Sequence, residues 1–400
     1  MSIFEKWKQG LQWSKIQDEI GEPPWEYNFL YNLPEREYPK YLAKIFNYRT
    51  GEKLPLKWDF KNQAWIIDKN KCKTFNQKIQ WLKLYGVTPL MRNCTDKVKV
   101  RDYVKEKIGE EYLKPVLQII PNDTSVIANH NSILGGEAIR EEVKQVIRNE
   151  NSGIKPEFQN VDCRGTEKAV VPRNDREPND FSTYFDQIDF DKLPQAFVIK
   201  CNHGCKWQYR IKKKDDFLSN NLLIDIVKRN MTGWLEQEYW CFEGFEMQYR
   251  VSHRVKPPIG NLGAQTRLCD GIEPKILIEE FIPESSVIEI YCFNEIPEII
   301  AYIKNTNDSK ISVYRNDFSY CDLVLKKEDK EHITKIPVDK FLKQAVDLSK
   351  KLSKGFIFVR VDFIVYQNKL YFEELTFTPY SGFSDFGNKW EMKLGEFIKI

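Results

Sequence analysis

A segment near the C-terminal end of the sequence, residues 355–379 (GFIFVRVDFIVYQNKLYFEELTFTP), has the alternation of a β-hairpin. Successive side chains of a strand point to opposite faces, so the first strand divides into two sets. One set is entirely apolar: Ile357, Val359, Val361, Phe363 and Val365. The other set has two charged members, Arg360 and Asp362, among Phe356, Phe358 and Ile364. The hairpin therefore belongs to a core sheet that carries charges on one side.

These charges permit two interpretations. In the first, Arg360 and Asp362 form an internal ion pair, because burying either charge unpaired would cost several kcal/mol. The adjacent Glu373 and Glu374 then lie at the sheet edge. In the second, Asp362 and one glutamate bind a divalent cation, since Mg²⁺ takes carboxylate oxygens from only one or two residues. Arg360 would then bind a phosphoryl group or a developing oxyanion.

The length of the hairpin loop decides which glutamate faces Asp362, because a shift of one residue in the pairing exchanges the faces. A two-residue loop, Gln367–Asn368, pairs Asp362 with Glu373. A three-residue loop, residues 367–369, pairs it with Glu374 and leaves Glu373 on the opposite face. The residues alone leave this choice open.

Composition limits the class of protein. A chain of 400 residues with 42% apolar content exceeds one hydrophobic core, so two or three coupled subdomains are expected. The formal charge of +3 gives no electrostatic footprint for nucleic acid. No apolar run approaches the ~20 residues of a membrane helix, and the N-terminal residues lack the pattern of a secretory signal. Nine cysteines, an odd number, indicate reduced thiols and a cytoplasmic location. The spacing of Cys201, His203 and Cys205 does not favour a zinc site.

The order of predicted elements suggests how the chain is organised. Residues 1–72 are predicted to form short helices and loops. Helices are expected after Thr74, ending at Gly86, and between Thr95 as N-cap and Gly109 as C-cap. Two loop-rich insertions are expected: residues 120–182 and 255–274. The predicted strands are FVIK (197–200), WQYRI (207–211), KILIEEFIP (275–283) and VIEIYCFN (287–294). Two later helices are predicted, at residues 221–237 and 338–355.

Several segments together carry a resemblance to a known family. The hairpin pattern R-x-D followed by E-L-T-F-T-P-x-S-G resembles the metal-binding end of the TupA-like ATP-grasp family, which is associated with capsule and teichuronopeptide biosynthesis. The segments in the family's order are KTFNQKIQWLKLYG, TDKVKVRDYV, LPQAFVIKCNHG, ILIEEFIP, YCFNEIPEII and the hairpin. The resemblance spans roughly residues 73–400. It implies an α+β ATP-grasp fold in which two subdomains grip ATP.

Domain boundaries follow from this resemblance. Residues 1–72 are an N-terminal extension, and residues 73–190 a helical region with a polar insertion. Residues 191–282 form the first ATP-grasp subdomain, with the phosphate loop and the adenine hinge, and residues 283–400 form the second, with the phosphoryl-transfer site.

The resemblance also assigns roles to individual residues. Asp362 and Glu374 take the metal positions, and Arg360 stabilises the oxyanion or phosphoryl group. Thr376 stands where many ATP-grasp enzymes have asparagine. The residues implied to contact the acceptor substrate are Thr376, Thr378, Ser381 and Gly382. The residues implied to contact the nucleotide are Lys97, Lys200, the loop Asn202, His203 and Gly204, and the hinge Glu279, Glu280, Phe281 and Ile282.

Alternative interpretations of these residues are structural. Lys97 could be a surface helix lysine, Lys200 a strand-end lysine with a buried stem, and Glu279 and Glu280 solubility residues of an edge strand.

One segment departs from the family pattern. Val287, Ile288 and Glu289 stand where the family usually has Asp-Tyr-Lys. Glu284 or Glu289 is the candidate to bind the ribose hydroxyls in place of the missing acid. Lys304 is the candidate to supply the missing positive charge at the catalytic site.

The resemblance implies a Mg²⁺- and ATP-dependent carboxylate-amine ligase. Its expected acceptor is a uronic acid of a cell-surface polysaccharide or of its precursor, and its second substrate an amine or amino acid. Nucleic acid is not an expected partner. Peripheral association with glycan-assembly enzymes is expected. Two alternatives are an ATP-dependent glycan or small-molecule kinase using the same site, and a non-catalytic carbohydrate-binding or assembly protein.

Overall fold

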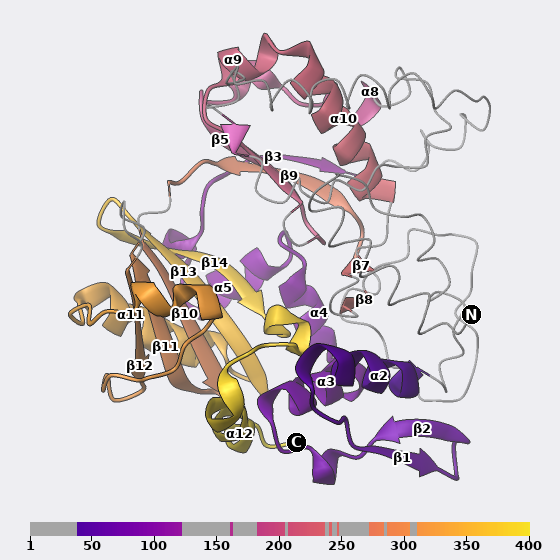
Figure 1. Cartoon of the computed structure of the whole chain (residues 1–400). Helices are drawn as coiled ribbons and strands as arrows, with labels where there is room; N and C mark the ends of the chain where they lie inside the picture. Colours follow the sequence, from indigo (N-terminus) through magenta and orange to yellow (C-terminus); the bar gives the residue numbers. More distant parts are fainter. Residues whose placement is uncertain are drawn as a thin grey trace, which may run out of the picture.

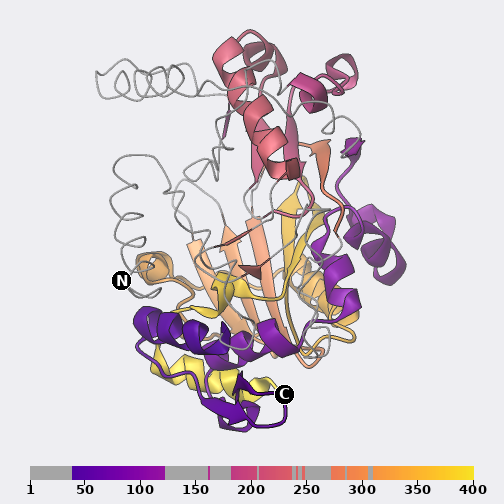
Figure 2. The ribbon, with the colours of Figure 1, turned by 90° about the vertical axis from the view of Figure 1, so that its right-hand side faces the viewer.

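The computed structural model describes residues 38–121, 161–162, 182–204, 207–236, 240–241, 246–247, 272–283, 286–304 and 310–400 (Figure 1). Two five-stranded antiparallel sheets dominate this part of the chain. Figure 2 shows the first sheet and its helices above the second sheet, with N-terminal helices and the C-terminal helix below. The fold is therefore α+β.

The second sheet comes from the C-terminal part of the chain and has the order β12-β11-β10-β13-β14. Its strands are β10 (Ser286–Phe293), β11 (Ile296–Lys304), β12 (Lys310–Arg315), β13 (Phe358–Tyr366) and β14 (Lys369–Thr376). Helix α11 (Lys340–Leu352) covers one face and packs on β10, β11 and β13 (Figure 1). This face carries Val359, Val361, Phe363 and Val365 of the predicted apolar set, which are buried with Ile288, Ile290 and Tyr302. Ile357, the remaining member of that set, precedes β13 and is exposed.

The opposite face of the second sheet is also buried, and an aromatic cluster lies near one end of it. Phe358, Tyr291 and Phe293 pack there against α3 (Phe75–Tyr85) and α12 (Gly387–Phe397). Phe75 lies edge-on to Phe358, with 5.2 Å between the ring centroids. The charged residues of β13 lie on this same face, beyond the aromatic cluster.

The first sheet has the order β3-β9-β5-β6-β4 and collects strands from distant parts of the chain. Its strands are β3 (Val116–Pro121), β4 (Val161–Asp162), β5 (Phe197–Cys201), β6 (Gln208–Ile211) and β9 (Lys275–Glu280). The helices α8 (Ser182–Phe185), α9 (Lys214–Leu218) and α10 (Asn221–Glu236) complete its core. This sheet includes the predicted strands at 197–200, 207–211 and 275–283.

The remaining described elements are short or lie toward the N-terminus. They are α2 (Tyr38–Thr50), β1 (Leu56–Asp59), β2 (Ala64–Ile67), α4 (Pro89–Thr95), α5 (Val100–Lys107), β7 (Trp240–Cys241), β8 (Glu246–Met247) and the 3₁₀ turns η3 (Lys69–Lys71), η4 (Glu110–Tyr112), η8 (Phe190–Lys192), η9 (Lys327–His332) and η10 (Pro379–Gly382). The β1–β2 hairpin replaces the loops expected before residue 72. Residues 1–37 and most of both predicted insertions lie outside the described residues.

The two predicted helices at 74–109 have different outcomes. The first is confirmed: Thr74 and Gln77 form a capping box at the start of α3, and Gly86 is the C-cap. The second is wrong at its start, because Thr95 ends α4 instead of capping α5. Asp96 turns the chain between the two helices, where its carboxylate accepts from the backbone N–H of Val98 at 2.9 Å. The helix also ends one residue early, with Ile108 instead of Gly109 as C-cap.

Candidate functional site

The hairpin of β13 and β14 combines a short loop with a β-bulge. Tyr366 pairs with Lys369, so the loop has two residues, Gln367 and Asn368, both with positive φ. The three-residue loop, which the metal position that the resemblance assigns to Glu374 required, is therefore wrong. Asp362 nevertheless lies opposite Glu374, because the register shifts by one residue between Asp362 and Phe363. The extra residue in β14 is Glu373.

The bulge has a direct cause in the sequence of β14. Phe372 and Leu375 are both buried in the core on the face where α4 packs against β14, and two residues separate them where strict alternation allows one. A bulge accommodates the extra residue and turns two consecutive side chains away from the buried face. Glu373 and Glu374 are both half-buried. Glu374 lies opposite Asp362, as expected, whereas Glu373 is the bulged residue and has no partner in the β13–β14 register.

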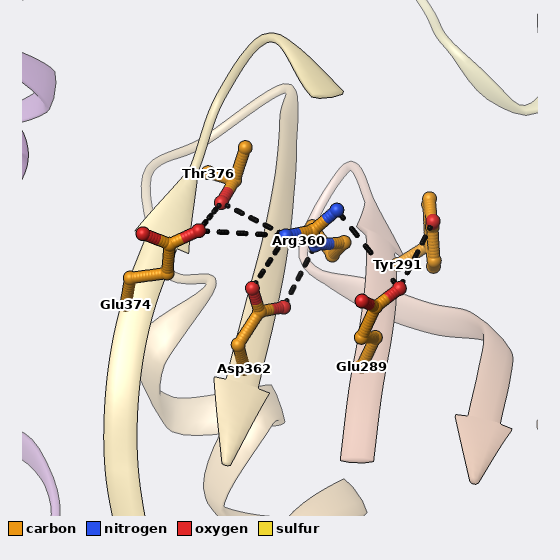
Figure 3. A network of polar contacts seen from close by, with 6 residues as sticks. All are labelled: Glu289, Tyr291, Arg360, Asp362, Glu374 and Thr376. Atoms are coloured by element: carbon orange, nitrogen blue, oxygen red, sulfur yellow. Dashed lines mark hydrogen bonds and ion pairs between the residues drawn. The ribbon is translucent and has the colours of Figure 1, made fainter. Parts of the chain in front are cut away.

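Arg360 lies at the centre of a polar cluster on the face of the sheet that carries Asp362 (Figure 3). Its guanidinium donates twice to Asp362, at 2.8 and 2.6 Å, and once to Glu374 at 3.4 Å. Thr376 donates to Glu374 at 2.8 Å, and Glu289 on β10 lies 3.9 Å from the guanidinium. The structure thus contains the ion pair of the first interpretation, with two further carboxylates around the same arginine.

The charge of this cluster is unbalanced. Three carboxylates, from Glu289, Asp362 and Glu374, face one guanidinium. Burial raises the pKa of Asp362 well above its usual range, Arg360 opposes that rise, and Glu289 and Glu374 add to it. Burial alone would lower the pKa of Arg360, but Asp362 and Glu289 outweigh it and raise this pKa well above its ordinary value. An additional cation would relieve the surplus of negative charge.

The donor atoms of the cluster fit a hard divalent cation. Carboxylate oxygens from two residues, completed by phosphate or water oxygens, are the usual shell of Mg²⁺. Asp362 and Glu374 supply such a pair from directly opposite positions of β13 and β14. Across the described ranges, no group of three or more His, Cys, Asp or Glu side chains is arranged as a complete metal site. The residues present therefore fit an ion shared with a ligand better than a closed structural site.

A pocket lies between the two sheets. Its lining combines the first sheet, the segment before β3 and one residue of β14: Val198, Lys200, Gln208, Arg210, Glu279, Glu280, Phe281, Ile282, Lys114 and Glu373. Five of these residues are the nucleotide-contacting residues expected from the sequence, namely Lys200 and the four hinge residues. Three cations and three carboxylates line it, so it offers charged partners of both signs to a ligand.

Lys200 lies at the floor of this pocket and is almost fully buried. Its ammonium lies 2.5 Å from Glu279, whose other carboxylate oxygen is 3.6 Å from Arg101 of α5. Burial would lower the pKa of Lys200, but Glu279, Glu373 and Glu374 outweigh it and raise the pKa above its usual value. The Lys200 ammonium is therefore charged, and the carboxylates of Glu373 and Glu374 in the second sheet stabilise that charge.

Glu373 connects the pocket to the second sheet. Its carboxylate forms an ion pair with Lys114, whose side chain is 12% exposed. Burial would raise the pKa of Glu373, but Lys114 and Lys200 outweigh it and lower the pKa to about 2. Glu373 is therefore ionised at neutral pH and is held by the cations of the pocket.

The loop after β5 is held from several sides. Asn202 is fully buried, and its amide donates to Asp96 at 3.1 Å and to the carbonyl of Glu273 at 2.9 Å. Lys97 donates its ammonium to the carbonyl of Gly204 and its backbone N–H to the carbonyl of Asn202. The side chain of Asn202 thus serves the loop itself, and Lys97 reaches the loop from the turn between α4 and α5.

His203 and Gly204 complete this loop. His203 is buried, with Nδ1 3.0 Å from the sulfur of Cys201, and its ring is edge-on to Trp207. A side chain at Gly204 would collide with Trp207, since a Cβ there would lie 2.4 Å from the ring. Cys205 lies outside the described residues.

The predicted acceptor loop is shaped by α3. Tyr380, Ser381 and Gly382 have consecutive positive φ values of 51°, 55° and 72°, which is unfavourable for the two residues that are not glycine. Gln80 donates to the carbonyls of Ser381 and Gly382 at 3.0 and 2.8 Å, and Lys83 donates to that of Ser381 at 2.9 Å. The loop begins at the buried Thr378, two residues after Thr376 of the Arg360 cluster.

Three predicted residues have different outcomes. Lys304 is not part of the Arg360 cluster: its ammonium lies over the ring of Tyr302, which is buried on the α11 face. Alternation along β11 therefore places Lys304 on the wrong side of the sheet for the expected role. Glu289 does join the cluster, where Tyr291 donates to it at 3.4 Å, and Glu284 lies outside the described residues.

Lys114 and Arg210 of the pocket were absent from the sequence prediction, and Glu373 was considered only as a partner of Asp362. Gln208 and Arg210 alternate along β6 with the buried Tyr209 and Ile211, a pattern that marks a polar face and could have indicated Arg210. Lys114 and Glu373 carried no comparable signal, because their meeting depends on the bulge and on the packing of the two sheets.

Comparison with known families finds a match in the C-terminal part of the chain. Residues 265–399 match the family model described as TupA-like ATPgrasp, the family that the sequence resembles. This region contains β9, the second sheet and both carboxylates of the candidate metal pair. The ATP-grasp fold class expected from the sequence is confirmed on this match. No curated protein matches the chain.

Solved structures give weaker likenesses. D-alanine-D-alanine ligase from Helicobacter pylori is 13% identical over 91% of this chain and 84% of that chain, with a TM-score of 0.34. The enzyme from Coxiella burnetii is 11% identical over 90% of this chain and 77% of that chain, also with a TM-score of 0.34. The chain spans about half, 46%, of the matched ligase from Bacillus anthracis, with 18% identity and a TM-score of 0.25. TM-scores this low do not establish a common fold by themselves.

None of the helices in the described ranges is both long enough and apolar enough to cross a membrane.

Proposed function

We propose that the chain is an ATP- and Mg²⁺-dependent carboxylate-amine ligase. The observation that carries the proposal is the juxtaposition of Asp362 and Glu374 across β13 and β14, with Arg360 between them, in the region that matches the TupA-like ATPgrasp family. A pocket with positively charged residues adjoins this cluster through β14. Together they supply groups of both signs for a nucleotide triphosphate and its cation.

Each group has a distinct part in this proposal. Lys200 neutralises phosphate charge from the floor of the pocket, and the backbone of residues 279–282 lies where the adenine would bind. Asp362 and Glu374 hold Mg²⁺, which supplies positive charge to the phosphate oxygens when bound. Arg360 already spans the carboxylates of the cluster and can stabilise negative charge that develops on the acceptor.

The reaction conserves atoms and charge in two steps. The acceptor carboxylate attacks the γ-phosphorus of ATP, the bond to the β-γ bridging oxygen breaks, and ADP leaves. The amine nitrogen then attacks the carbonyl carbon of the acyl phosphate and loses a proton. The C–O bond to phosphate breaks, so the products are an amide, ADP and inorganic phosphate. Oriented hydrogen-bond donors account for most of the acceleration in such sites.

The acceptor class rests on the resemblance alone. A uronic acid of a cell-surface polysaccharide or of its precursor, joined to an amino acid or another amine, would satisfy the chemistry above. The predicted acceptor loop, from Thr378 to Gly382, follows directly from the Arg360 cluster and is held in shape by α3. It is the proposed place for that acid.

The test is a screen of acids and amines for stimulated release of ADP. Purified protein is incubated with Mg-ATP, a panel of uronic acids and a panel of amino acids, and ADP and phosphate are measured with the mass of the product. The ligase is supported by equal release of ADP and phosphate that requires both an acid and an amine, with an amide product. Phosphate retained on the acceptor would establish a kinase instead. No nucleotide binding in calorimetry, with and without Mg²⁺, would overturn both.

A further inference from the structure

The bulge in β14 sends two adjacent glutamates to two different places. Glu374 joins the Arg360 cluster, whereas Glu373 reaches across to Lys114 at the edge of the pocket. Bulges are common beside active sites, where they redirect a side chain. Here one extra residue gives β14 a contact with each of the two functional regions.

Lys114 is itself anchored in the first sheet. Its carbonyl accepts from Arg101 at 2.7 Å, and the carbonyl of the next residue, Pro115, accepts from the N–H of Glu280 in the hinge at 3.1 Å. Arg101 also lies 3.6 Å from Glu279, the partner of Lys200. The backbone of Lys114 therefore belongs to the nucleotide side of the molecule, while its ammonium binds the other side.

We infer that the Lys114–Glu373 ion pair is a positioning element that fixes β14, and with it Glu374, relative to Lys200 and the hinge. This inference rests on the proposed function, since it assumes that a nucleotide lies in the pocket and reacts at the Arg360 cluster. Both side chains are largely shielded from water, at 12% and 28% exposure, so solvent screens the pair less than a surface ion pair. Neither residue needs to touch a reacting atom for this role.

The inference predicts a specific kinetic signature. Lys114→Met leaves an unpaired negative charge in the pocket and should raise the KM for ATP, whereas Glu373→Gln removes that charge and should lower the KM. Both variants should lower kcat, by roughly tenfold, because misplacement of a catalytic group by a fraction of an ångström to 1 Å can cost this much or more. A loss of folded protein alone would not move the two KM values in opposite directions.

Two further variants provide matched controls. Lys114→Arg keeps the positive charge and should retain most of the wild-type kcat. Lys105→Met removes a lysine of the same chain region that pairs with Glu110 at 2.5 Å, but on the exposed surface, and should leave kcat and KM unchanged. The double variant K114M/E373Q should lose no more kcat than the worse single variant, because the two residues act as one unit.

A readout without nucleotide separates this inference from the proposed function. Amide hydrogen exchange of residues 369–376 should be faster in K114M and E373Q than in the wild type and K105M. Unchanged exchange together with unchanged kcat and KM in both variants would overturn the inference. A wild-type protein that releases no ADP but shows the exchange difference would instead overturn the proposed function and leave the positioning pair standing.

Discussion

The two five-stranded sheets place their charges in opposite ways. In the first sheet Lys200 and Arg210 face the pocket, and Lys200 is bound by a single glutamate, Glu279. In the second sheet a single arginine, Arg360, is surrounded by three carboxylates. The first arrangement suits an anion such as a phosphate, and the second suits a cation. A nucleotide with its metal ion needs both.

The contrast also appears in how the sheets protect their charges from water. Lys200 and Glu279 are buried together, with side-chain exposures of 9% and 5%. In the second sheet Glu374 is 45% exposed although its partner Asp362 is buried. The carboxylate pair is therefore open on one side, where an ion shared with a ligand could enter.

The largest expected effect comes from removing a carboxylate of the second sheet. Asp362→Asn and Glu374→Gln should each lower kcat for ADP release by about a hundredfold or more, because a preorganised contact to developing charge is worth about 3 kcal/mol. Steady-state kinetics at saturating ATP measure this effect. Glu374→Gln is the cleaner variant, since the bidentate contact between Arg360 and Asp362 remains.

A matched control for these variants is Asp322→Asn. Asp322 pairs with Lys389 at 2.7 Å on the exposed surface and lies outside the cluster. It should keep the wild-type kcat. Normal activity in both D362N and E374Q would refute the assignment of the metal pair.

The next effect tests the anion-binding side of the comparison. Lys200→Met should weaken ATP binding roughly tenfold, because an ammonium in a shielded pocket attracts a phosphate by more than 1 kcal/mol. The change also removes one of the two ion-pair partners of Glu279, which keeps Arg101 at 3.6 Å. The double variant K200M/E279Q removes this buried negative charge as well, so it separates the loss of ATP binding from the effect of a poorly paired Glu279. Isothermal calorimetry measures the affinity and thermal unfolding the stability.

Lys192→Met is the control for this variant, because Lys192 pairs with Asp189 at 2.6 Å but is 82% exposed. If K200M lowered kcat and left ATP affinity unchanged, the assignment of phosphate binding to the first sheet would be wrong.

Sequence reasoning succeeded best where strands adjacent in the chain also pair. The two strands of the β13–β14 hairpin are adjacent in sequence, and the alternation of β13 identified the face that carries Arg360 and Asp362. Strands β11 and β12 were not predicted. The pairing of Asp362 with Glu374 was anticipated, but from the wrong loop. Whether β14 bulges at this point depends on how Phe372 and Leu375 pack in the core that α4 covers, and no local pattern encodes this.

The first sheet was harder to predict because its neighbours are far apart in the chain. Strand β9, at residues 275–280, lies between β3 and β5, and β3 precedes it by more than 150 residues. The hairpin of β5 and β6 and the apolar run of β9 were visible in the sequence. Lys114 gave no signal, because its partner Glu373 belongs to the other sheet. Lys304 failed for the opposite reason, since proximity along the chain did not reveal which face it occupies.

A smaller effect concerns a buried carboxylate outside both sheets. Glu391 of α12 accepts from the backbone N–H of Asn76 at 3.1 Å and from the hydroxyl of Ser384 at 2.9 Å. Burial raises its pKa from 4.5 to about 7, and the neighbouring Glu52 adds to the rise. The folded protein thus binds a proton between pH 4.5 and 7 that the unfolded chain has released. Stability should fall as pH rises through this window, by about 3 kcal/mol at most.

Glu391→Gln should remove this pH dependence, since the amide resembles the protonated acid. The variant should match the wild type at pH 5 and be more stable at pH 8, as measured by denaturant midpoints. Equal stability changes at both pH values would show that Glu391 is ionised in the folded protein.

The smallest effect tests whether the two sheets respond independently. Thr74 caps α3 through the backbone N–H of Gln77 at 3.2 Å, and loss of such a cap costs about 1 kcal/mol. Thr74→Ala should therefore lower stability by about that amount, whereas Thr74→Ser, which keeps the hydroxyl, should change it by a few tenths. Because Phe75 of α3 packs on Phe358 of β13, amide exchange should rise in α3 and β13 and stay unchanged in β5 and β9. Faster exchange in both sheets would mean that they unfold as one cooperative unit. The anion-binding and cation-binding halves would then differ in their charges but not in their folding.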